Sequence, residues 1–247
     1  MRERLLAHPA VREWGRRLPA PARAALKRAL AAAEAPRWGN LRRLRPFSDR
    51  YGFDRGLPVD RFYIEGFLAR HSGDVRGRVL EVKDAAYTRR FGGDAVTASE
   101  VLDIDPANVE ATLVADLCEP DSLPAGAFDC FLLTQTLQLL PDVERGLGNA
   151  WRGLSPGGVL LLTVPTVARV DRHLSEIDFW RFTPRGLREA LDRSCPGAEA
   201  VVEGFGNLVA AIAFLAGLAA RELRAEELAH ADPYFPVLAA ARVRKPA

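Results

Sequence analysis

Residues 154–165 read Leu-Ser-Pro-Gly-Gly-Val-Leu-Leu-Leu-Thr-Val-Pro, and this stretch decides the fold. Its second half, residues 159–164, is an apolar run broken only by Thr163, which is typical of a strand buried on both faces of a sheet. The Ser-Pro-Gly-Gly turn before it ends a helix that the pattern of residues 143–154 predicts. A buried strand that follows a helix in this way indicates a parallel sheet with helices on both faces.

The same alternation of strand and helix extends to both sides of this stretch. Before it, we expect a helix over residues 60–71 and strands at 78–82, within 96–104, at 112–116 and at 128–133. After it, we expect a helix over 184–191, a strand near 200–202, one helix from 208 to about 230 and a last strand near 235–243. Repeated units of this length predict an α/β fold, a Rossmann-like, doubly wound and mostly parallel sheet.

The N-terminal part of the chain has a different character. Residues 1–35 carry two short helical patterns, and residues 37–61 form an irregular stretch rich in arginine, glycine, proline and aromatic residues. We therefore expect residues 1–60 to be a helical and irregular extension that covers the site. Residues 61–247 are expected to form the Rossmann-like domain.

Composition narrows the class of protein. The chain has 247 residues, a formal charge of +2, 48% hydrophobic and 27% charged residues, values ordinary for a globular protein with a real core. Three cysteines without CxxC spacing argue against a disulfide-stapled module and a zinc ribbon. Four histidines, far apart in sequence, disfavour metal catalysis, so we expect no metal site.

Partners and location follow from the same composition. The longest apolar run, residues 208–220, is shorter than the roughly 20 residues that span a bilayer, and no secretory signal is visible, so we expect a cytoplasmic protein without a membrane partner. The basic excess of the first 50 residues lies on helices without interleaved aromatics, which disfavours nucleic-acid binding. The apolar run suits core packing, with a dimer face or a cover for substrate as alternatives.

Acidic and polar residues follow the predicted parallel strands, where such sheets bind ligands. Residues 81–87 follow the first strand, and Asp103 and Asp105 follow the second. Asp116 follows the third strand, and Thr134-Gln135 follow the fourth. A carboxylate after the second strand can accept both hydroxyls of a ribose, and one after the third can accept from an adenine amino group. The pattern therefore predicts a nucleoside site at this edge.

These residues belong to a longer resemblance. Phe128-Asp-Cys-Phe-Leu-Leu-Thr-Gln-Thr-Leu-Gln-Leu-Leu-Pro-Asp142, followed by residues 154–165, resembles class I S-adenosylmethionine-dependent methyltransferases in their fourth strand and "L-x-P-G-G" turn. Trp180-Arg-Phe-Thr-Pro184 is similar to the "RFT" start of their next helix. Residues 51–65 and 87–93 resemble a bacterial subgroup, methyltransferase type 11-like, found in glycan and natural-product contexts.

The resemblance implies S-adenosylmethionine as the cofactor and methyl transfer to a small molecule or a sugar or glycan-type acceptor. In this family the segment before the sheet commonly covers the cofactor, so Arg61 and Tyr63 are also implied as cofactor contacts. Helix capping and surface ion pairs are the alternative roles for residues of that segment. The implied cofactor contacts are Glu81, Lys83, Asp84, Ala85, Asp103, Asp105, Asp116, Thr134, Gln135, Arg61 and Tyr63.

One motif departs from the family pattern. The family has an acidic residue and then G-x-G-x-G after the first strand, whereas Lys83, Ala85 and Tyr87 fill the glycine positions here. A lysine places a cation beside the sulfonium of the cofactor. The alternative is therefore a methyltransferase-like protein that no longer methylates, a non-methylating catalyst or a partner-binding subunit. An NAD-dependent oxidoreductase would share the fold, but no GxGxxG follows the first strand.

The catalytic candidates lie after the fifth strand, in residues 169–180, where the family places substrate loops. His173 and Asp178 are candidate general bases for an oxygen or nitrogen acceptor. Asp171 is a weaker base of the same kind, and the alternative for His173 is a surface residue without a role. A homodimer through the apolar run remains a candidate partner arrangement.

Overall fold

The structure of the protein, a computed structural model, describes residues 19–25, 28 and 39–247. The chain forms two compact units, Met1–Leu44 and Arg45–Ala247.

In the first unit, residues 20–25 and 28 are helical and Gly39–Leu41 form a 3-10 turn. Most of the helical patterns expected over residues 1–35 lie outside the described residues. The domain boundary expected after residue 60 lies within the first helix of the second unit.

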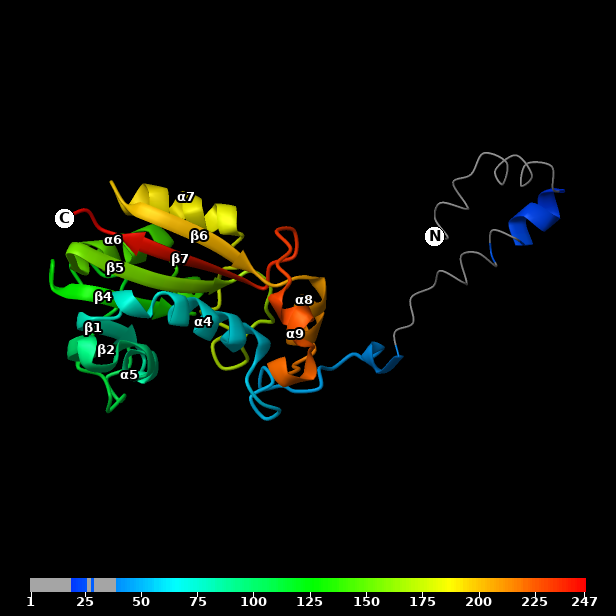
Figure 1. The fold of residues 1–247 in the computed structure, drawn as a ribbon, viewed down its shortest axis with the longest axis horizontal. Coiled ribbons are helices and arrows are strands. Elements are labelled where there is room, and N and C mark those ends of the chain that lie inside the picture. The colour runs from blue at the N-terminus through cyan, green and yellow to red at the C-terminus, as the bar shows by residue number, and fades with distance from the viewer. Residues whose placement is uncertain (1–18, 26–27, 29–38) are drawn as a thin grey trace. The chain divides into compact units, whose positions relative to one another are not determined.

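One seven-stranded sheet organises the second unit, in the order β3-β2-β1-β4-β5-β7-β6 (Figure 1). Its strands are Gly77–Val82 (β1), Val96–Asp103 (β2), Leu113–Val114 (β3), Phe128–Thr134 (β4), Leu154–Pro165 (β5), Glu199–Phe205 (β6) and Leu238–Arg244 (β7). The neighbours from β3 to β5 pair in parallel, and β7 runs antiparallel to β5 and β6. The expected Rossmann-like, mostly parallel α/β fold is confirmed.

Helices cover both faces of the sheet (Figure 1). The helices are Val59–Arg70 (α4), Ala86–Gly92 (α5), Val143–Gly153 (α6), Pro184–Ser194 (α7), Leu208–Leu215 (α8) and Ala225–Ala229 (α9). Short 3-10 turns span Ser72–Asp74, Gly93–Ala95, Leu137–Leu139 and Ala220–Glu222. α6 and α7 pack on one face, while α4, α8 and α9 pack on the other.

The central strands contribute side chains to two hydrophobic cores, one on each face of the sheet. In β5, Leu160 and Leu162 join the core under α6 and α7, whereas Leu161 joins the core under α4 and α8. All three are 0% exposed. This alternation confirms the burial on both faces that the apolar run predicted, because successive strand residues point to opposite faces.

Two predicted boundaries were wrong. The helix expected from residue 208 to about 230 stops after α8, where Gly217 has a φ of 74°. Its N–H donates to the carbonyl of Phe214 and the N–H of Leu218 donates to Ala213, the glycine-dependent motif that ends helices. The Ser-Pro-Gly-Gly turn is part of β5 itself, and a Cβ on Gly158 would lie 3.0 Å from the carbonyl oxygen of Phe128.

None of the helices in the described part of the chain is long and apolar enough to span a bilayer. Among the same residues, no group of three or more His, Cys, Asp or Glu side chains is arranged to hold a metal ion.

We predict that Gly217→Ala destabilises the protein strongly. The left-handed backbone costs an L-residue about 1–2 kcal/mol, and the added Cβ would lie 2.3 Å from the carbonyl oxygen of Ser48, which adds to that cost. Gly148→Ala in α6 is the matched control, because a Cβ there meets nothing within 4 Å and its φ is ordinary. Urea denaturation should show a large loss in the free energy of unfolding for Gly217→Ala and no loss for Gly148→Ala. Equal losses in the two variants would contradict the requirement for glycine at position 217.

Candidate functional site

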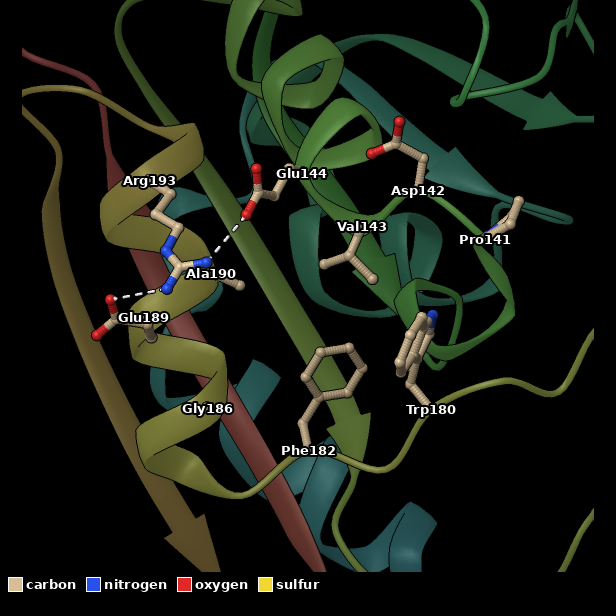
Figure 2. Close-up of a pocket in the computed structure, with 10 residues that line it drawn as sticks. All are labelled: Pro141, Asp142, Val143, Glu144, Trp180, Phe182, Gly186, Glu189, Ala190 and Arg193. Atoms are coloured by element: carbon tan, nitrogen blue, oxygen red, sulfur yellow. Dashed lines mark hydrogen bonds and ion pairs between the residues drawn. The ribbon is translucent and has the colours of Figure 1, made fainter.

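A cavity of about 1030 Å³ opens at the carboxyl ends of the parallel strands. Its walls come from the ends of β1 to β4, from the segment at residues 51–65 and from the loop at residues 165–181. A second depression, of about 600 Å³, lies between α6 and α7, where Arg193 bridges Glu144 and Glu189 (Figure 2). None of the predicted site residues lines that depression, so the strand-end cavity is the candidate site.

Glu81 organises the loop after β1. Its side chain is 2% exposed, and its carboxylate accepts from the N–H groups of Tyr87 and Thr88 at 3.0 and 2.7 Å and from the Thr88 hydroxyl at 2.7 Å. Burial raises the pKa of Glu81, and these donors oppose that rise. The carboxylate therefore holds the first turn of α5 against the end of β1.

Lys83 occupies a backbone conformation that favours glycine. Its φ is 78°, its N–H donates to Leu102 and its carbonyl accepts from the Asn108 amide at 2.7 Å. Its side chain is exposed on the cavity rim. Among the described residues, no ion pair joins its ammonium to Glu81 or Asp84.

The acidic residues after β2 and β3 line the cavity and keep accepting capacity. Asp103 accepts from the Asp105 N–H at 3.0 Å through one oxygen and from the Asn108 amide at 2.7 Å through the other. Asp116 accepts from the N–H of Cys118 through Oδ1 at 2.7 Å. Because each carboxylate oxygen has two lone pairs, both groups can accept further hydrogen bonds from a ligand.

The end of β4 adds polar groups to the same wall. Thr134 and Gln135 line the cavity, and Gln135 has a φ of 50°. The Gln138 amide donates to the Gln135 carbonyl at 2.8 Å, and its Oε1 is buried without a hydrogen-bond partner. No pattern in the sequence marks Gln138, because its role depends on the 3-10 turn that points it inward.

The start of α4 forms the opposite wall. Asp60 and Arg61 line the cavity. Asp60 is 9% exposed, and its Oδ1 is buried without a partner. The N-cap of α4 is Pro58, which makes no side-chain capping bond, so the helix-capping alternative for this segment finds no support at the cap itself. Arg55 of the same segment forms an ion pair with Glu222, as the surface ion-pair alternative expects.

The loop after β5 is tied to the segment before α4. The Tyr51 hydroxyl donates to Asp171 at 2.9 Å, and the Arg169 guanidinium lies 3.8 Å from the centre of the Tyr51 ring. Burial and the bond to Asp171 raise the pKa of Tyr51 to about 12. Burial acts to raise the pKa of Asp171, but its donors outweigh burial and the pKa is lowered.

Asp178 is held in an ion pair. Arg181 donates to its two oxygens at 2.5 and 2.8 Å, and the Asp171 N–H donates to it at 2.9 Å. The hydrogen bonds from Arg181 are the main reason why the pKa of Asp178 is lowered. Asp178 is therefore a poor proton acceptor, which removes the support for a general-base role.

The cavity brings together most of the predicted residues. Those that line it are Arg61, Glu81, Lys83, Asp84, Asp103, Asp105, Asp116, Thr134, Gln135 and Asp178. Three do not line it. Ala85 is buried behind the loop, the Tyr63 hydroxyl donates to the Leu228 carbonyl at 3.1 Å, and His173 is an exposed loop residue.

Residues 82–162 match a protein family described as "Methyltransferase domain". The matched segment resembles a methyltransferase domain. Together with the strand order, this match supports the class I S-adenosylmethionine-dependent methyltransferase family expected from the sequence. The cofactor of that family is S-adenosylmethionine, as expected. No curated protein matches the chain.

Several solved structures are similar to this methyltransferase domain. An S-adenosylmethionine-dependent methyltransferase from Mesorhizobium loti is 21% identical, with 78% of this chain and 100% of that chain covered and a TM-score of 0.52. The cyclase SpnF is 17% identical, with 75% and 80% covered and a TM-score of 0.51. A methyltransferase from Archaeoglobus fulgidus is 14% identical, with 75% and 94% covered and a TM-score of 0.51. At these identities the likeness shows the shared fold.

We predict that Asp178→Asn lowers the free energy of unfolding at neutral pH by roughly 1.5–3 kcal/mol, because Arg181, whose side chain is 26% exposed, loses its charged hydrogen-bond partner. A carboxyl whose folded pKa is lowered stabilises the protein above its unfolded pKa, and this stabilisation is lost as pH falls through the folded pKa. The difference in the free energy of unfolding between parent and variant should therefore become smaller below about pH 4.

Denaturation curves at neutral and acidic pH check this prediction. Asp192→Asn is the control, because Asp192 pairs with Arg188 on an exposed helix face and such pairs contribute about 0.3–0.5 kcal/mol. A gap for Asp178→Asn that is equally wide at both pH values would contradict the ion-pair assignment.

Proposed function

We propose that the protein transfers a methyl group from S-adenosylmethionine to a small molecule or a sugar or glycan-type acceptor. When bound, the cofactor supplies an electrophilic methyl group on a sulfonium. Residues that line the strand-end cavity would hold the cofactor and the acceptor and exclude water between them. A cytoplasmic location and a homodimer remain part of the proposal as expectations from the sequence.

The observation that carries the proposal is the pair of carboxylates after β2 and β3. Asp103 and Asp116 line one cavity from neighbouring strand ends and retain free lone pairs. A ribose offers two hydroxyl donors and an adenine offers an amino donor, so the two carboxylates suit the two halves of a nucleoside. The residues present therefore fit the cofactor of the family.

The methionine end of the cofactor would lie between the loop after β1 and the start of α4. Arg61 reaches the cavity from α4, and a guanidinium suits a carboxylate ligand. Burial raises the pKa of Tyr87, against the opposing charge of Arg61 beside it. The turn that Glu81 stabilises keeps the backbone of this loop in place to receive a ligand.

The acceptor would occupy the rest of the cavity. Phe53, Phe179, Phe214 and Leu174 supply apolar surface there. Ligand cavities of roughly 300–1,000 Å³ accommodate small molecules. A small acceptor beside the cofactor fits a cavity of about 1030 Å³, and apolar walls would keep water from the transferred methyl group.

Lys83 is the observation that favours a second candidate, a methyltransferase-like protein that no longer methylates. Its ammonium would lie near a sulfonium, and like charges repel in a partly desolvated site. Its side chain is exposed on the cavity rim, where water and salt screen the repulsion, which is why we place methyl transfer first.

We predict that Asp103→Ala and Asp116→Ala each weaken S-adenosylmethionine binding by about 1–3 kcal/mol, because a ligand donor would lose its acceptor. Calorimetric titration measures the affinity. Glu119→Ala is the control, since Glu119 is an exposed carboxylate near Asp116 that lies outside the cavity. Unchanged affinity in both folded variants would remove the nucleoside assignment and, with it, the proposed function.

A further prediction concerns Lys83→Gly. Glycine adopts a φ of 78° without steric cost, so this variant should be at least as stable as the parent. The variant should bind S-adenosylmethionine more tightly than the parent does. Its gain in affinity should be smaller for S-adenosylhomocysteine, because that ligand lacks the sulfonium charge. Lys83→Gln separates charge from backbone conformation. If both ligands bind Lys83→Gly as they bind the parent, Lys83 lies outside the site.

A further inference from the structure

We propose that Asp60 is the proton acceptor for the nucleophile of the acceptor substrate, and that this nucleophile is a neutral group bearing a hydrogen, an amine or a hydroxyl. The inference rests on the proposed function, which it deepens by naming the class of acceptor and the base. The base is then neither His173 nor Asp178.

The first observation is the state of the Asp60 carboxyl. The residue is 9% exposed and lines the cavity, and its Oδ1 is buried without a hydrogen-bond partner. Leaving a carboxyl oxygen buried and unpaired destabilises a folded protein, so native structures rarely do so without a functional reason. A ligand that donates a hydrogen bond would satisfy this oxygen.

The other carboxylates of the cavity wall already have partners. Glu65 pairs with Arg90 at 2.7 Å, and Glu81 accepts from three donors of α5. Asp171 accepts from Tyr51, and Asp178 is held by Arg181. The acidic residues after β1, β2 and β3 each accept a backbone N–H. Asp60 is the wall carboxylate whose buried oxygen is unused.

Gln138, which also lines this cavity, holds a second buried hydrogen-bond acceptor without a partner. Gln138 is 8% exposed. Its Nε2 donates to the Gln135 carbonyl, and because only the nitrogen end of an amide can donate, this bond fixes the other end as the oxygen. The remaining Oε1 is buried without a partner. Two unpaired hydrogen-bond acceptors favour a ligand that donates hydrogen bonds. A substrate whose nucleophile is a carboxylate or a thiolate would instead place its lone pairs against those of the two oxygens.

The charged groups around Asp60 suit a base. Arg61, Glu65, Tyr87 and Arg90 line the same part of the cavity wall, from α4 and α5. Burial raises the pKa of Asp60, opposed by the charge of Arg61 and by backbone N–H groups. A carboxyl with a raised pKa accepts a proton more readily than an ordinary one near neutral pH. The charge of Arg61 disfavours a cationic acceptor, which agrees with a neutral nucleophile.

The proton balance of the step is simple. The nucleophile donates its hydrogen bond to Oδ1 of Asp60 before reaction. As the new bond to the transferred methyl carbon forms, the electron pair of the breaking sulfur–carbon bond stays on sulfur. The nitrogen or oxygen loses its proton to Asp60, which becomes a neutral acid and releases the proton to solvent after the product leaves.

The test uses ligand binding to the full chain saturated with S-adenosylhomocysteine. Aniline, phenol, benzoate and toluene form a matched set, because the first two are neutral donors at neutral pH, the third is an anion and the fourth has no donor. Saturation-transfer NMR measures their binding to the parent, to Asp60→Asn and to Glu65→Gln. Glu65→Gln removes a carboxylate from the same helix and the same cavity, and is the matched control.

We expect aniline and phenol to bind the parent at least tenfold more tightly than benzoate or toluene. Asp60→Asn should reduce that preference, because a neutral amide oxygen accepts a hydrogen bond more weakly than a carboxylate while Gln138 is unchanged. Its affinity for S-adenosylhomocysteine and its thermal midpoint should not fall, and Glu65→Gln should keep the full preference. Benzoate binding as tightly as aniline, an absent preference in the parent, or an undiminished preference in Asp60→Asn overturns the inference. Weaker S-adenosylhomocysteine binding by Asp60→Asn overturns it too, because Asp60 would then belong to the cofactor.

The two proposals fail differently. If the parent does not bind S-adenosylhomocysteine, the proposed function fails and the inference fails with it. If it binds the nucleoside but shows no preference for neutral donors, only the assignment of Asp60 fails.

Discussion

The buried carboxylate of Glu81 is the interaction on which the candidate site depends. Glu81 lies one residue before the end of β1 and accepts three hydrogen bonds from the first turn of α5, which fixes the loop between them at both ends. This explains how a loop without the family's glycines keeps its path. Lys83 takes the left-handed conformation that a glycine would take, and its exposed side chain leaves the cavity open.

A second constraint shapes the acceptor side. Tyr51 bonds to Asp171 from 120 residues away, Arg169 donates to the Asp49 carbonyl at 2.7 Å, and Gly217 closes against Ser48. These contacts join the segment before α4, the loop after β5 and the end of α8 into one wall. The wall is therefore ordered by its own contacts, and the acceptor meets a preformed surface. Preformed walls lower the entropy that a ligand loses on binding.

Much of the fold could be predicted because its signals are local. The apolar run in β5 and the alternation of strands and helices follow from hydrophobic spacing, which depends on neighbours in sequence. The one long helix expected after residue 208 was wrong because its apolar residues continue past Gly217, where backbone conformation, and not hydrophobicity, ends α8. Likewise the Ser-Pro-Gly-Gly turn joins β5 because a tight approach to Phe128 needs a glycine.

The order of strands and helices along the chain, and the acidic residues at the strand ends, could be predicted from local sequence, because parallel strands bring their carboxyl ends to one edge whatever the loops do. Which carboxyl groups are free to act depends on contacts between distant parts of the fold. Asp171 and Asp178 are occupied by Tyr51 and Arg181, and His173 stays outside the cavity. Asp60 is buried there with an unused oxygen. The physical reason is that the reactivity of a carboxyl depends on burial and hydrogen-bond partners, and long-range packing supplies both.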